Sequence, residues 1–354
     1  MLPSHGSNPH YLYDSLSIAQ PEETLDFSAN LNPFGPPKAL IEKWPDAFNL
    51  ITTYPDPHAS SLTKKLAAMH DTEESHVLVG NGGAELITLV GRFLFHKRVC
   101  IVQPAFSEYE EACRSAGCEI TYHMLEEGWR LDPNPLIEIM NHLDAIFLCT
   151  PNNPTGVSYD AETVRTLIAE ADKRACYLII DEAFADFLQK EPCYTVEILT
   201  NKRLIILRSL TKMFAIPGLR LGYMMAHPEV IRTVKKLKPH WSVNALALMA
   251  GEICIEEQAY MTLTRKFIEE EREKLQTFFE KHRYIYSRSS VNFYLLKDPE
   301  QIDQAPLLLY LMKNGIVPRH TENFPGLNGR WLRFAIRTSD ENDRLMEVLA
   351  SWRR

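Results

Sequence analysis

The sequence lacks the cysteine patterns that mark disulfide-rich or zinc-binding proteins. It has seven scattered cysteines and no Cys-x-x-Cys pair: Cys100, Cys113, Cys118, Cys149, Cys176, Cys193 and Cys254. Several lie inside apolar runs, as is typical of reduced core residues in a cytosolic protein. We therefore expect neither a disulfide framework nor a metal site.

The chain also lacks an excess of positive charge and a long apolar run. It contains 38 Lys and Arg against 46 Asp and Glu, for a formal net charge of -8. This balance argues against nucleic acid or an anionic membrane as the main partner. No apolar stretch approaches the length that spans a bilayer. The N-terminal stretch has neither a basic start nor an apolar segment, so we expect no signal peptide and a cytoplasmic location.

The chain does contain a regular alternation of apolar strand candidates and helix candidates. Its 354 residues, 45% of them hydrophobic and 24% charged, are enough for a large domain with an appendage. The alternation predicts a three-layer α/β domain whose mostly parallel sheet is covered by helices on both faces. The expected strands are 77–79, 99–102, 118–123, 145–149, 177–180 and 204–207, and the expected helices between them include 107–116 and 161–175.

The pattern changes after Ala226. Helix candidates at 228–238, 245–255, 262–282 and 306–313 and strand candidates at 284–288, 292–296 and 331–336 follow one another there, which indicates a small α+β domain at the C-terminal end. Residues 1–37 have little periodicity and many polar turn formers. We therefore divide the chain into an N-terminal arm of residues 1–37, a large domain of residues 38–240 and a small domain of residues 241–354.

One lysine, Lys212, follows the strand candidate at 204–207. Its neighbours Leu210, Met213 and Phe214 are apolar. Desolvation disfavours a charged ammonium, so a free amine suited to Schiff-base chemistry becomes accessible near neutral pH. Judged alone, an ordinary surface lysine remains the alternative, because Ser-x-x-Lys pairs are common by chance.

Polar and aromatic residues also follow other strand candidates. Phe106, Asn153 and Asp181 come after the strands at 99–102, 145–149 and 177–180. Ligands of parallel sheets gather beyond the carboxyl ends of the strands, so we expect these residues to converge with Lys212.

A phosphate site is predicted from two further segments. The turn Gly80-Asn81-Gly82-Gly83 opens a helix candidate, where the amides of Gly83 and Ala84 form an anion site. The turn is neither a Walker loop nor a dinucleotide fingerprint. Ser209 and Arg220, on either side of Lys212, are placed to hold the same phosphate.

These groups together meet the requirements of pyridoxal 5'-phosphate. Asp181 against the ring nitrogen keeps the pyridinium protonated, Asn153 donates to the phenolate oxygen, and Phe106 stacks on the ring. We therefore predict pyridoxal 5'-phosphate as the cofactor, with Lys212 and Asp181 as the catalytic residues.

Several motifs carry a resemblance to known families. TPNNPTG (150–156), DEAF (181–184) and RSLTKMFAIPGLRLGY (208–223) resemble the aspartate-aminotransferase-like, fold-type I pyridoxal phosphate enzymes, and among them the histidinol-phosphate aminotransferases. HGSN (5–8), DFSANLNPFG (26–35), WSVNALA (241–247) and NFPGLNGRWLRFAIRT (323–338) are similar to the L-threonine O-phosphate decarboxylases of cobalamin biosynthesis. The resemblance covers nearly the whole chain.

The resemblance implies a homodimer and further site residues. Tyr54 would reach the cofactor phosphate of the neighbouring subunit, so that the active sites are shared. Phe184 stands where many relatives have a tyrosine that donates to the phenolate, in keeping with the decarboxylases. The substrate's carboxylate and phosphate would be held by His5, Asn30, Arg319 and Arg333. Which arginine takes which anion stays open, and Arg337 is expected to face solvent.

The predicted function is the pyridoxal-phosphate-dependent decarboxylation of L-threonine O-phosphate to (R)-1-aminopropan-2-ol phosphate for the cobalamin side chain. A class I/II aminotransferase acting on histidinol phosphate or an aromatic amino acid would use the same cofactor site. A regulatory module that binds the cofactor without catalysis would need a DNA-binding segment, for which the chain has no spare N-terminal length and no basic surface run.

Overall fold

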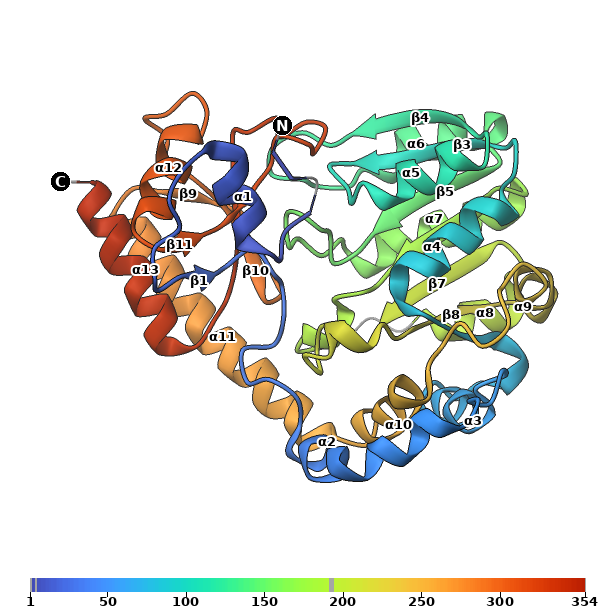
Figure 1. The fold of residues 1–354 in the computed structure, drawn as a ribbon. Helices are drawn as coiled ribbons and strands as arrows, with labels where there is room; N and C mark the ends of the chain where they lie inside the picture. Colours follow the sequence, from blue (N-terminus) through green and yellow to red (C-terminus); the bar gives the residue numbers. More distant parts are fainter. Residues whose placement is uncertain (1, 4, 191–193, 354) are drawn as a thin grey trace.

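The structure, a computed structural model, describes residues 2–3, 5–190 and 194–353. Within these residues, seven strands form one sheet in the order β2-β8-β7-β6-β5-β3-β4 (Figure 1). β3 to β7 pair in parallel, whereas β8 is antiparallel to both of its neighbours. The strands are β2 (Val77–Gly80), β3 (Arg98–Gln103), β4 (Glu119–Met124), β5 (Ala145–Cys149), β6 (Tyr177–Asp181), β7 (Leu204–Ser209) and β8 (Gly222–Ala226). The predicted mostly parallel sheet is confirmed, and the antiparallel β8 is an addition to it.

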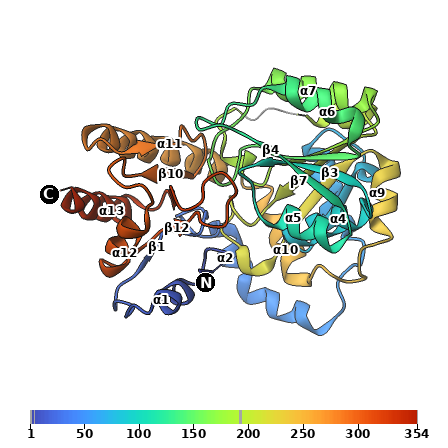
Figure 2. The same ribbon diagram turned by 90° about the horizontal axis from the view of Figure 1, so that it is seen from above.

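Helices cover both faces of this sheet. Successive side chains of a strand point to opposite faces, so Ile146 and Leu178 enter one core while Phe147 and Ile179 enter the other. Figure 2 shows α6 and α7 on one side of the sheet and α4 and α5 on the other. One face packs against α4 (Gly82–Phe93), α5 (Glu108–Ser115) and α9 (Pro228–Lys235), and the other against α6 (Pro133–Ile139), α7 (Ala161–Lys173) and α8 (Thr195–Thr200). The predicted three-layer arrangement is therefore confirmed.

A second, antiparallel sheet lies in the C-terminal part, with the strand order β12-β13-β10-β9. Phe279 of α11, Leu311 of α12 and Leu345 of α13 belong to the same core as Tyr294 of β10. The elements are α11 (Gln258–Lys281), β9 (Ile285–Tyr286), β10 (Phe293–Lys297), α12 (Ala305–Lys313), β12 (Arg319–His320), β13 (Leu332–Ala335) and α13 (Ser339–Trp352). These elements match the expected α+β composition.

The N-terminal arm joins the C-terminal part. Strand β1 (Leu25–Asp26) pairs in parallel with β11 (Ile316–Val317), and the Tyr13 hydroxyl of α1 (Pro9–Leu16) donates to the Met312 carbonyl oxygen at 2.8 Å. In contrast, α10 (Ala245–Cys254) packs against α2 (Lys38–Lys43) and α3 (Ser60–Met69), beside the large sheet (Figure 1). The exact division at residues 37 and 240 stays a prediction.

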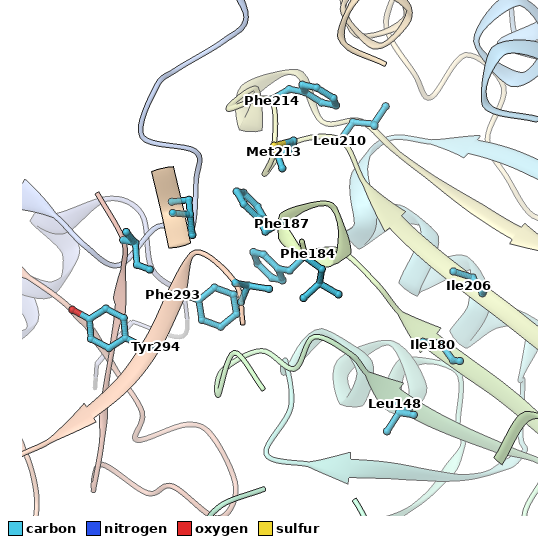
Figure 3. Packing of buried hydrophobic residues seen from close by; sticks show 14 of the residues in the cluster. Leu148, Ile180, Phe184, Phe187, Ile206, Leu210, Met213, Phe214, Phe293 and Tyr294 are labelled. Carbon is cyan, nitrogen blue, oxygen red and sulfur yellow. The ribbon is translucent and has the colours of Figure 1, made fainter. Parts of the chain in front are cut away.

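A continuous apolar core links the two parts of the molecule. Figure 3 shows Leu148, Ile180 and Ile206 of the large sheet in one cluster with Phe184 and with Phe293 of β10. The rings of Phe184 and Phe293 lie 4.7 Å apart in an edge-to-face arrangement. This contact holds the end of the large sheet against the small one.

Acidic and hydroxyl side chains fix the starts of two helices. At the start of α3, the Asp56 carboxylate accepts the Ser60 amide at 2.7 Å. Helix α13 begins with a capping box between Thr338 and Glu341, a pattern that is visible in the sequence but did not enter the predictions. Cys193 lies outside the described residues; the other six cysteines are free thiols. No helix in the described part of the chain is both long and apolar enough to cross a membrane.

Candidate active site

A cavity of about 240 Å³ lies beyond the carboxyl ends of the central strands. The ends of β5, β6 and β7 meet there because Cys149, Asp181 and Leu207 are neighbours in the sheet register. The N-terminal arm and β13 supply the opposite wall. The polar and aromatic lining residues include His5, Ser7, Ser28, Asn30, Phe106, Tyr109, Asn153, Asp181, Ser209, Thr211, Lys212, Arg220 and Arg333.

Lys212 lies in the loop after β7 and lines the cavity. The loop is fixed by Asn32, whose side-chain amide donates to the Met213 carbonyl oxygen at 2.8 Å and whose backbone amide donates to the Lys212 carbonyl oxygen at 3.1 Å. Burial, aided by the charges of Arg333 and Arg220, lowers the pKa of Lys212 to about 8. The amine therefore exists partly in its neutral, nucleophilic form near neutral pH.

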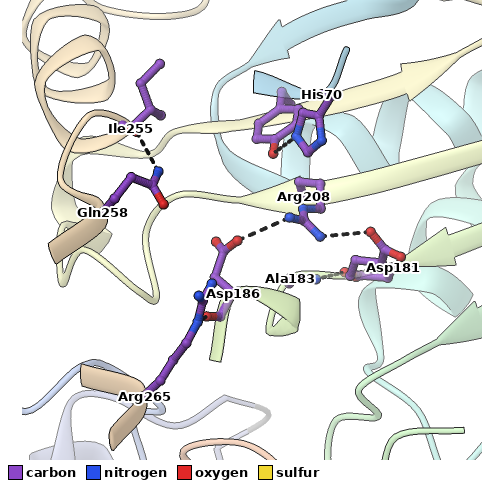
Figure 4. Close-up of polar contacts among 10 residues, drawn as sticks. His70, Asp181, Ala183, Asp186, Arg208, Ile255, Gln258 and Arg265 are labelled. Atoms are coloured by element: carbon purple, nitrogen blue, oxygen red, sulfur yellow. Dashed lines mark hydrogen bonds and ion pairs between the residues drawn. The ribbon is translucent and has the colours of Figure 1, made fainter. Parts of the chain in front are cut away.

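Asp181 ends β6 and is buried beside the same cavity. The Tyr109 hydroxyl donates to its Oδ2 at 2.6 Å. The Ala183 amide donates to its Oδ1 at 2.9 Å (Figure 4). Burial raises the pKa of Asp181, while these two donors and Lys212 act in the opposite direction. A cationic partner for this carboxylate would offset the cost of its desolvation.

A buried ion-pair cluster fixes the strand ends next to the cavity. Arg208 of β7 lies 2.9 Å from Glu182. It also lies 3.2 Å from Asp186 (Figure 4). Glu182 directly follows Asp181, so this pair ties the end of β6 to the end of β7. A rigid frame of this kind holds Asp181 and Lys212 in a fixed relation.

The start of α4 forms one end of the cavity. Gly82 has a φ of +77°, and a Cβ at this position would lie 2.9 Å from the Arg220 guanidinium, so a side chain is excluded there. A Cβ on Gly83 would meet no atom within 4 Å, so this backbone is open to a ligand. The Glu85 carboxylate accepts the backbone amide of the N-cap residue Asn81 at 2.6 Å, but no described side chain accepts the amides of Gly83 and Ala84. The hydroxyls of Ser209 and Thr211 are 2.8 Å apart and also line the cavity. Free helix amides, hydroxyls and a guanidinium are the donor set that binds phosphate.

Arg333 forms the opposite end of the cavity. Its side chain is buried, donating to the Ser28 carbonyl oxygen at 2.8 Å and to Asn153 Oδ1 at 2.5 Å, and its Nε has no partner. Burial lowers the pKa of Arg333 to about 9. Asn30 Oδ1 is likewise buried without a partner. Buried polar atoms without partners are rare in proteins and indicate a missing ligand or water.

Comparisons with known proteins agree with this geometry. The family model described as aminotransferase class I and II matches residues 22–349. The chain belongs to this family. Its relatives include the threonine-phosphate decarboxylase of Salmonella typhimurium, which is 36% identical over 351 residues, 98% of this chain and 95% of that protein.

Two further known proteins are similar to nearly the whole chain. An adenosylcobalamin biosynthesis bifunctional protein of Leptospira interrogans is 32% identical over 99% of this chain, which spans 41% of that larger protein. The crystal structure of the histidinol-phosphate aminotransferase from Clostridium acetobutylicum superposes with a TM-score of 0.88, at 28% identity, over 93% of this chain and 99% of that one. The predicted fold-type I architecture is thereby confirmed.

Membership of the aminotransferase class I and II family makes the protein a pyridoxal-phosphate-dependent enzyme, as predicted. The cavity fits this cofactor. The start of α4, with Gly83 open beside it, suits the phosphate, and the buried carboxylate of Asp181 suits a protonated ring nitrogen.

Most of the predicted site residues line the cavity together. Gly83, Ala84, Phe106, Asn153, Asp181, Ser209, Lys212 and Arg220 do so, as do His5, Asn30 and Arg333. His5 also lies 3.2 Å from Glu108, and its ring meets the edge of Phe106 at 5.9 Å. The individual roles assigned to these residues stay predictions.

Arg319, Tyr54 and Arg337 lie outside this cavity; the roles of Arg319 and Tyr54 stay predictions, and the expectation for Arg337 needs correction. Arg319 does not line the main cavity; it is buried beside it, where its Nη2 donates to Asn323 Oδ1 at 2.6 Å. Tyr54 is 85% exposed and also lies outside the cavity of its own chain, against the ring of Trp241. Arg337 does not face solvent freely, because it is half-buried and pairs with Glu341 at 2.8 Å.

Tyr109, Cys149 and Thr211 line the cavity without having been predicted as site residues. The signal for Tyr109 was its place in the first turn of α5, three positions after the predicted site residue Phe106. Thr211 directly precedes Lys212 and could have been noted beside Ser209.

Proposed function

We propose that this enzyme decarboxylates L-threonine O-phosphate to (R)-1-aminopropan-2-ol phosphate and carbon dioxide, for the cobalamin side chain. The observation that carries the proposal is the buried guanidinium of Arg333, which enters the cavity from the side opposite α4 with an unpartnered Nε. One anion site would serve the cofactor phosphate, and a second would remain for an anionic substrate. The decarboxylase and cobalamin relatives support this choice of substrate.

The residues that would hold the cofactor follow from the cavity walls. The amides of Gly83 and Ala84, with Ser209 and Arg220, would bind the phosphate. Asp181 would keep the ring nitrogen protonated, and Phe106 would stack on the ring. When bound, pyridoxal 5'-phosphate supplies an electron-withdrawing ring that accepts the electron pair left by a broken bond at the substrate Cα.

Asn153 would donate to the phenolate oxygen. Its Oδ1 already accepts a hydrogen bond from Arg333, which leaves Nδ2 as the group that can donate to a ligand. Phe184 lines the cavity and offers no hydroxyl, so Asn153 would act there without a tyrosine partner.

The substrate's two anionic groups would be held by the arm and by β13. Arg333 would pair with one anion, and His5 and Asn30 would contact the substrate from the arm. Arg319, opposite Arg333 in the β12–β13 pair, is close enough in the sheet to add positive charge behind this wall. Asn30, Arg319 and Arg333 are buried, which excludes water and strengthens their electrostatic contacts, whereas His5 is exposed.

The reaction releases carbon dioxide by breaking the bond between Cα and the carboxylate, and a proton then takes the carboxylate's place on Cα. Lys212 is the candidate donor of this proton, because its amine lines the cavity and its pKa of about 8 allows both forms near neutral pH. The same residue would first act as the nucleophile that joins the cofactor.

A direct assay tests the proposal. The purified enzyme is loaded with pyridoxal 5'-phosphate and incubated with L-threonine O-phosphate, and carbon dioxide and the amine product are measured. Equimolar release of both is expected. Transfer of the amino group to 2-oxoglutarate without carbon dioxide would refute the decarboxylase and favour the second candidate, a histidinol-phosphate or aromatic amino-acid aminotransferase, which the fold similarity to an aminotransferase supports.

We further propose a homodimer with shared sites. Tyr54, Phe48 and Ile51 are 85%, 71% and 59% exposed, which leaves an apolar surface for a second copy of the chain. In such a dimer, Tyr54 would reach the partner's phosphate site. The protein would work in the cytoplasm, where the free thiols of its described cysteines stay reduced.

Subunit mixing tests the shared site. Lys212→Ala and Tyr54→Ala proteins are each expected to be nearly inactive, but a heterodimer of the two has one site with both native residues. After random exchange in an equal mixture, about a quarter of wild-type activity is expected, because half of the dimers regain one of two sites. Recovery of no activity from verified heterodimers would place Tyr54 in its own subunit's site, and full activity of Tyr54→Ala alone would place it in none.

A further inference from the structure

Tyr109 makes the shortest described contact to the carboxylate of Asp181. Its hydroxyl donates to Oδ2 at 2.6 Å, and both residues are buried. The remaining oxygen, Oδ1, accepts the Ala183 amide at 2.9 Å. Each carboxylate oxygen thus has one fixed donor from the protein and a second lone pair that can face the cavity.

The ring of Tyr109 is also held in place, by contacts with two other aromatic rings. It stacks on Phe147 at 5.3 Å with an interplanar angle of 18°, and it meets the ring of Phe106 edge-on at 6.0 Å. Phe106 is the residue expected to stack on the cofactor ring. One side chain therefore touches both the predicted ring-stacking residue and the predicted ring-nitrogen partner.

We propose that Tyr109 is a positioning residue that orients the Asp181 carboxylate toward the cofactor ring nitrogen and keeps it ionised. The proposal rests on the assignment of Asp181 to that nitrogen under the proposed function. A hydrogen bond to a charged acceptor is stronger than one between neutral groups, and here it is shielded from water.

The proton of this pair stays on Tyr109. Burial and the neighbouring charge of Asp181 raise the pKa of Tyr109 well above its ordinary value, so the phenol keeps its proton near neutral pH and remains a donor. The hydrogen bond in turn lowers the pKa of Asp181 against the opposing effect of burial. Loss of the hydroxyl would make the carboxylate more basic and free to rotate.

The test uses Tyr109→Phe, which keeps the ring and removes only the hydroxyl. Tyr159→Phe is the matched control, because Tyr159 is also a buried tyrosine, lies outside the cavity, and has a hydroxyl without a partner. Dissociation constants of each apoprotein are measured for pyridoxal 5'-phosphate and for its analogue with C–H in place of the ring nitrogen. The pH midpoint of the absorbance change of the bound cofactor is recorded as well.

Tyr109→Phe is expected to raise the dissociation constant of pyridoxal 5'-phosphate about tenfold, which is the effect of losing one hydrogen bond to a charged group. The dissociation constant of the analogue should stay within about twofold of the wild-type value. The absorbance midpoint should move upward, because a ring nitrogen that holds its proton less firmly makes the attached Lys212 nitrogen more basic. In an Asp181→Asn background, Tyr109→Phe should have no further effect on either measurement. Tyr159→Phe should change neither.

Equal weakening for both ligands would show that Tyr109 only supports the fold, and an unchanged constant and midpoint would show no role; either result overturns the proposal. Failure of the proposed cofactor placement would give a different result. If the wild type binds the two ligands equally well and Asp181→Asn changes neither constant, then Asp181 does not face the ring nitrogen, and the proposed cofactor placement falls together with this inference.

Discussion

Replacing Lys212 by methionine should stabilise the apoprotein near neutral pH. Burial lowers the pKa of Lys212 from 10.5 to about 8, so the folded protein disfavours the charged amine. A fall of this size corresponds to about 3 kcal/mol of unfolding free energy when the amine is charged. Part of the side chain is open to the cavity, where water screens the charge, so we expect a gain of about 1 to 3 kcal/mol for Lys212→Met.

The sign of the pH dependence follows from the same shift. Below about pH 8 the amine is charged in both the folded and the unfolded state, and the wild type bears the full penalty. As the pH rises from about 8 to 10.5, the folded state loses its proton first and the penalty disappears. The advantage of Lys212→Met should therefore shrink with rising pH.

Urea unfolding of the two apoproteins at about pH 7 and about pH 9.5 measures this difference. Methionine has nearly the length of the lysine stem, so little cavity is created by the change. An advantage for the methionine protein that is the same at both pH values, or a loss of stability at the lower pH, would refute the reasoning.

Three further predictions concern the walls of the cavity. Arg333→Gln should lower kcat/KM for L-threonine O-phosphate by about ten- to a hundredfold through loss of a charged contact, and should lower cofactor affinity by a smaller factor because the contact to Asn153 is also lost. Arg337→Gln, outside the cavity, should have little effect in the same steady-state assay. Gly83→Ala should not lower the urea midpoint of the apoprotein, since its Cβ meets no atom within 4 Å, but should weaken pyridoxal 5'-phosphate binding by about tenfold in an absorbance titration. Asn32→Ala should lower the free energy of unfolding by about 1 to 3 kcal/mol, because the buried Met213 carbonyl oxygen loses its donor, and denaturant unfolding of the apoprotein would measure it. Unchanged kcat/KM, unchanged cofactor affinity or unchanged stability, respectively, would contradict these three.

The sequence predicted the core of the site because topology places the carboxyl ends of parallel strands together. Asp181 and Lys212 are 31 positions apart, yet neighbouring strands β6 and β7 bring both to one cavity. An apolar strand followed by a single polar residue can be recognised from neighbouring residues alone. Because the carboxyl ends of parallel strands lie at one edge of the sheet, several such polar residues are predicted to lie together. The phosphate-binding end of the cavity was predictable for the same reason, because a glycine-rich turn before a helix can also be recognised from neighbouring residues.

Contacts that depend on side-chain direction across the fold could not be predicted in this way. The antiparallel strand β8 reads as an apolar run whose direction is set only by its pairing with β7 and β2. Arg319 and Arg333 are both buried on neighbouring strands, and only Arg333 reaches the main cavity. Tyr109 reaches Asp181 from a helix on one face of the sheet, a contact that requires the packing of α5 to be known.

The cavity walls carry an excess of positive charge, which anionic ligands would neutralise. Arg208, Lys212, Arg220 and Arg333 bring four cations to its walls, and Arg208 alone among them forms ion pairs with carboxylates, those of Glu182 and Asp186 behind the wall. Asp181 is the one carboxylate among the described residues that line the cavity. Burial lowers the pKa of both Lys212 and Arg333, which shows that the apoprotein holds these charges at a cost in stability. A phosphate at one end and an anionic substrate at the other would offset that cost, because an anion favours the charged form of a nearby amine or guanidinium. Ligand binding is therefore linked to stability. Cofactor and substrate together should raise the free energy of unfolding by more than their uncharged contacts alone would, because their anions remove this cost.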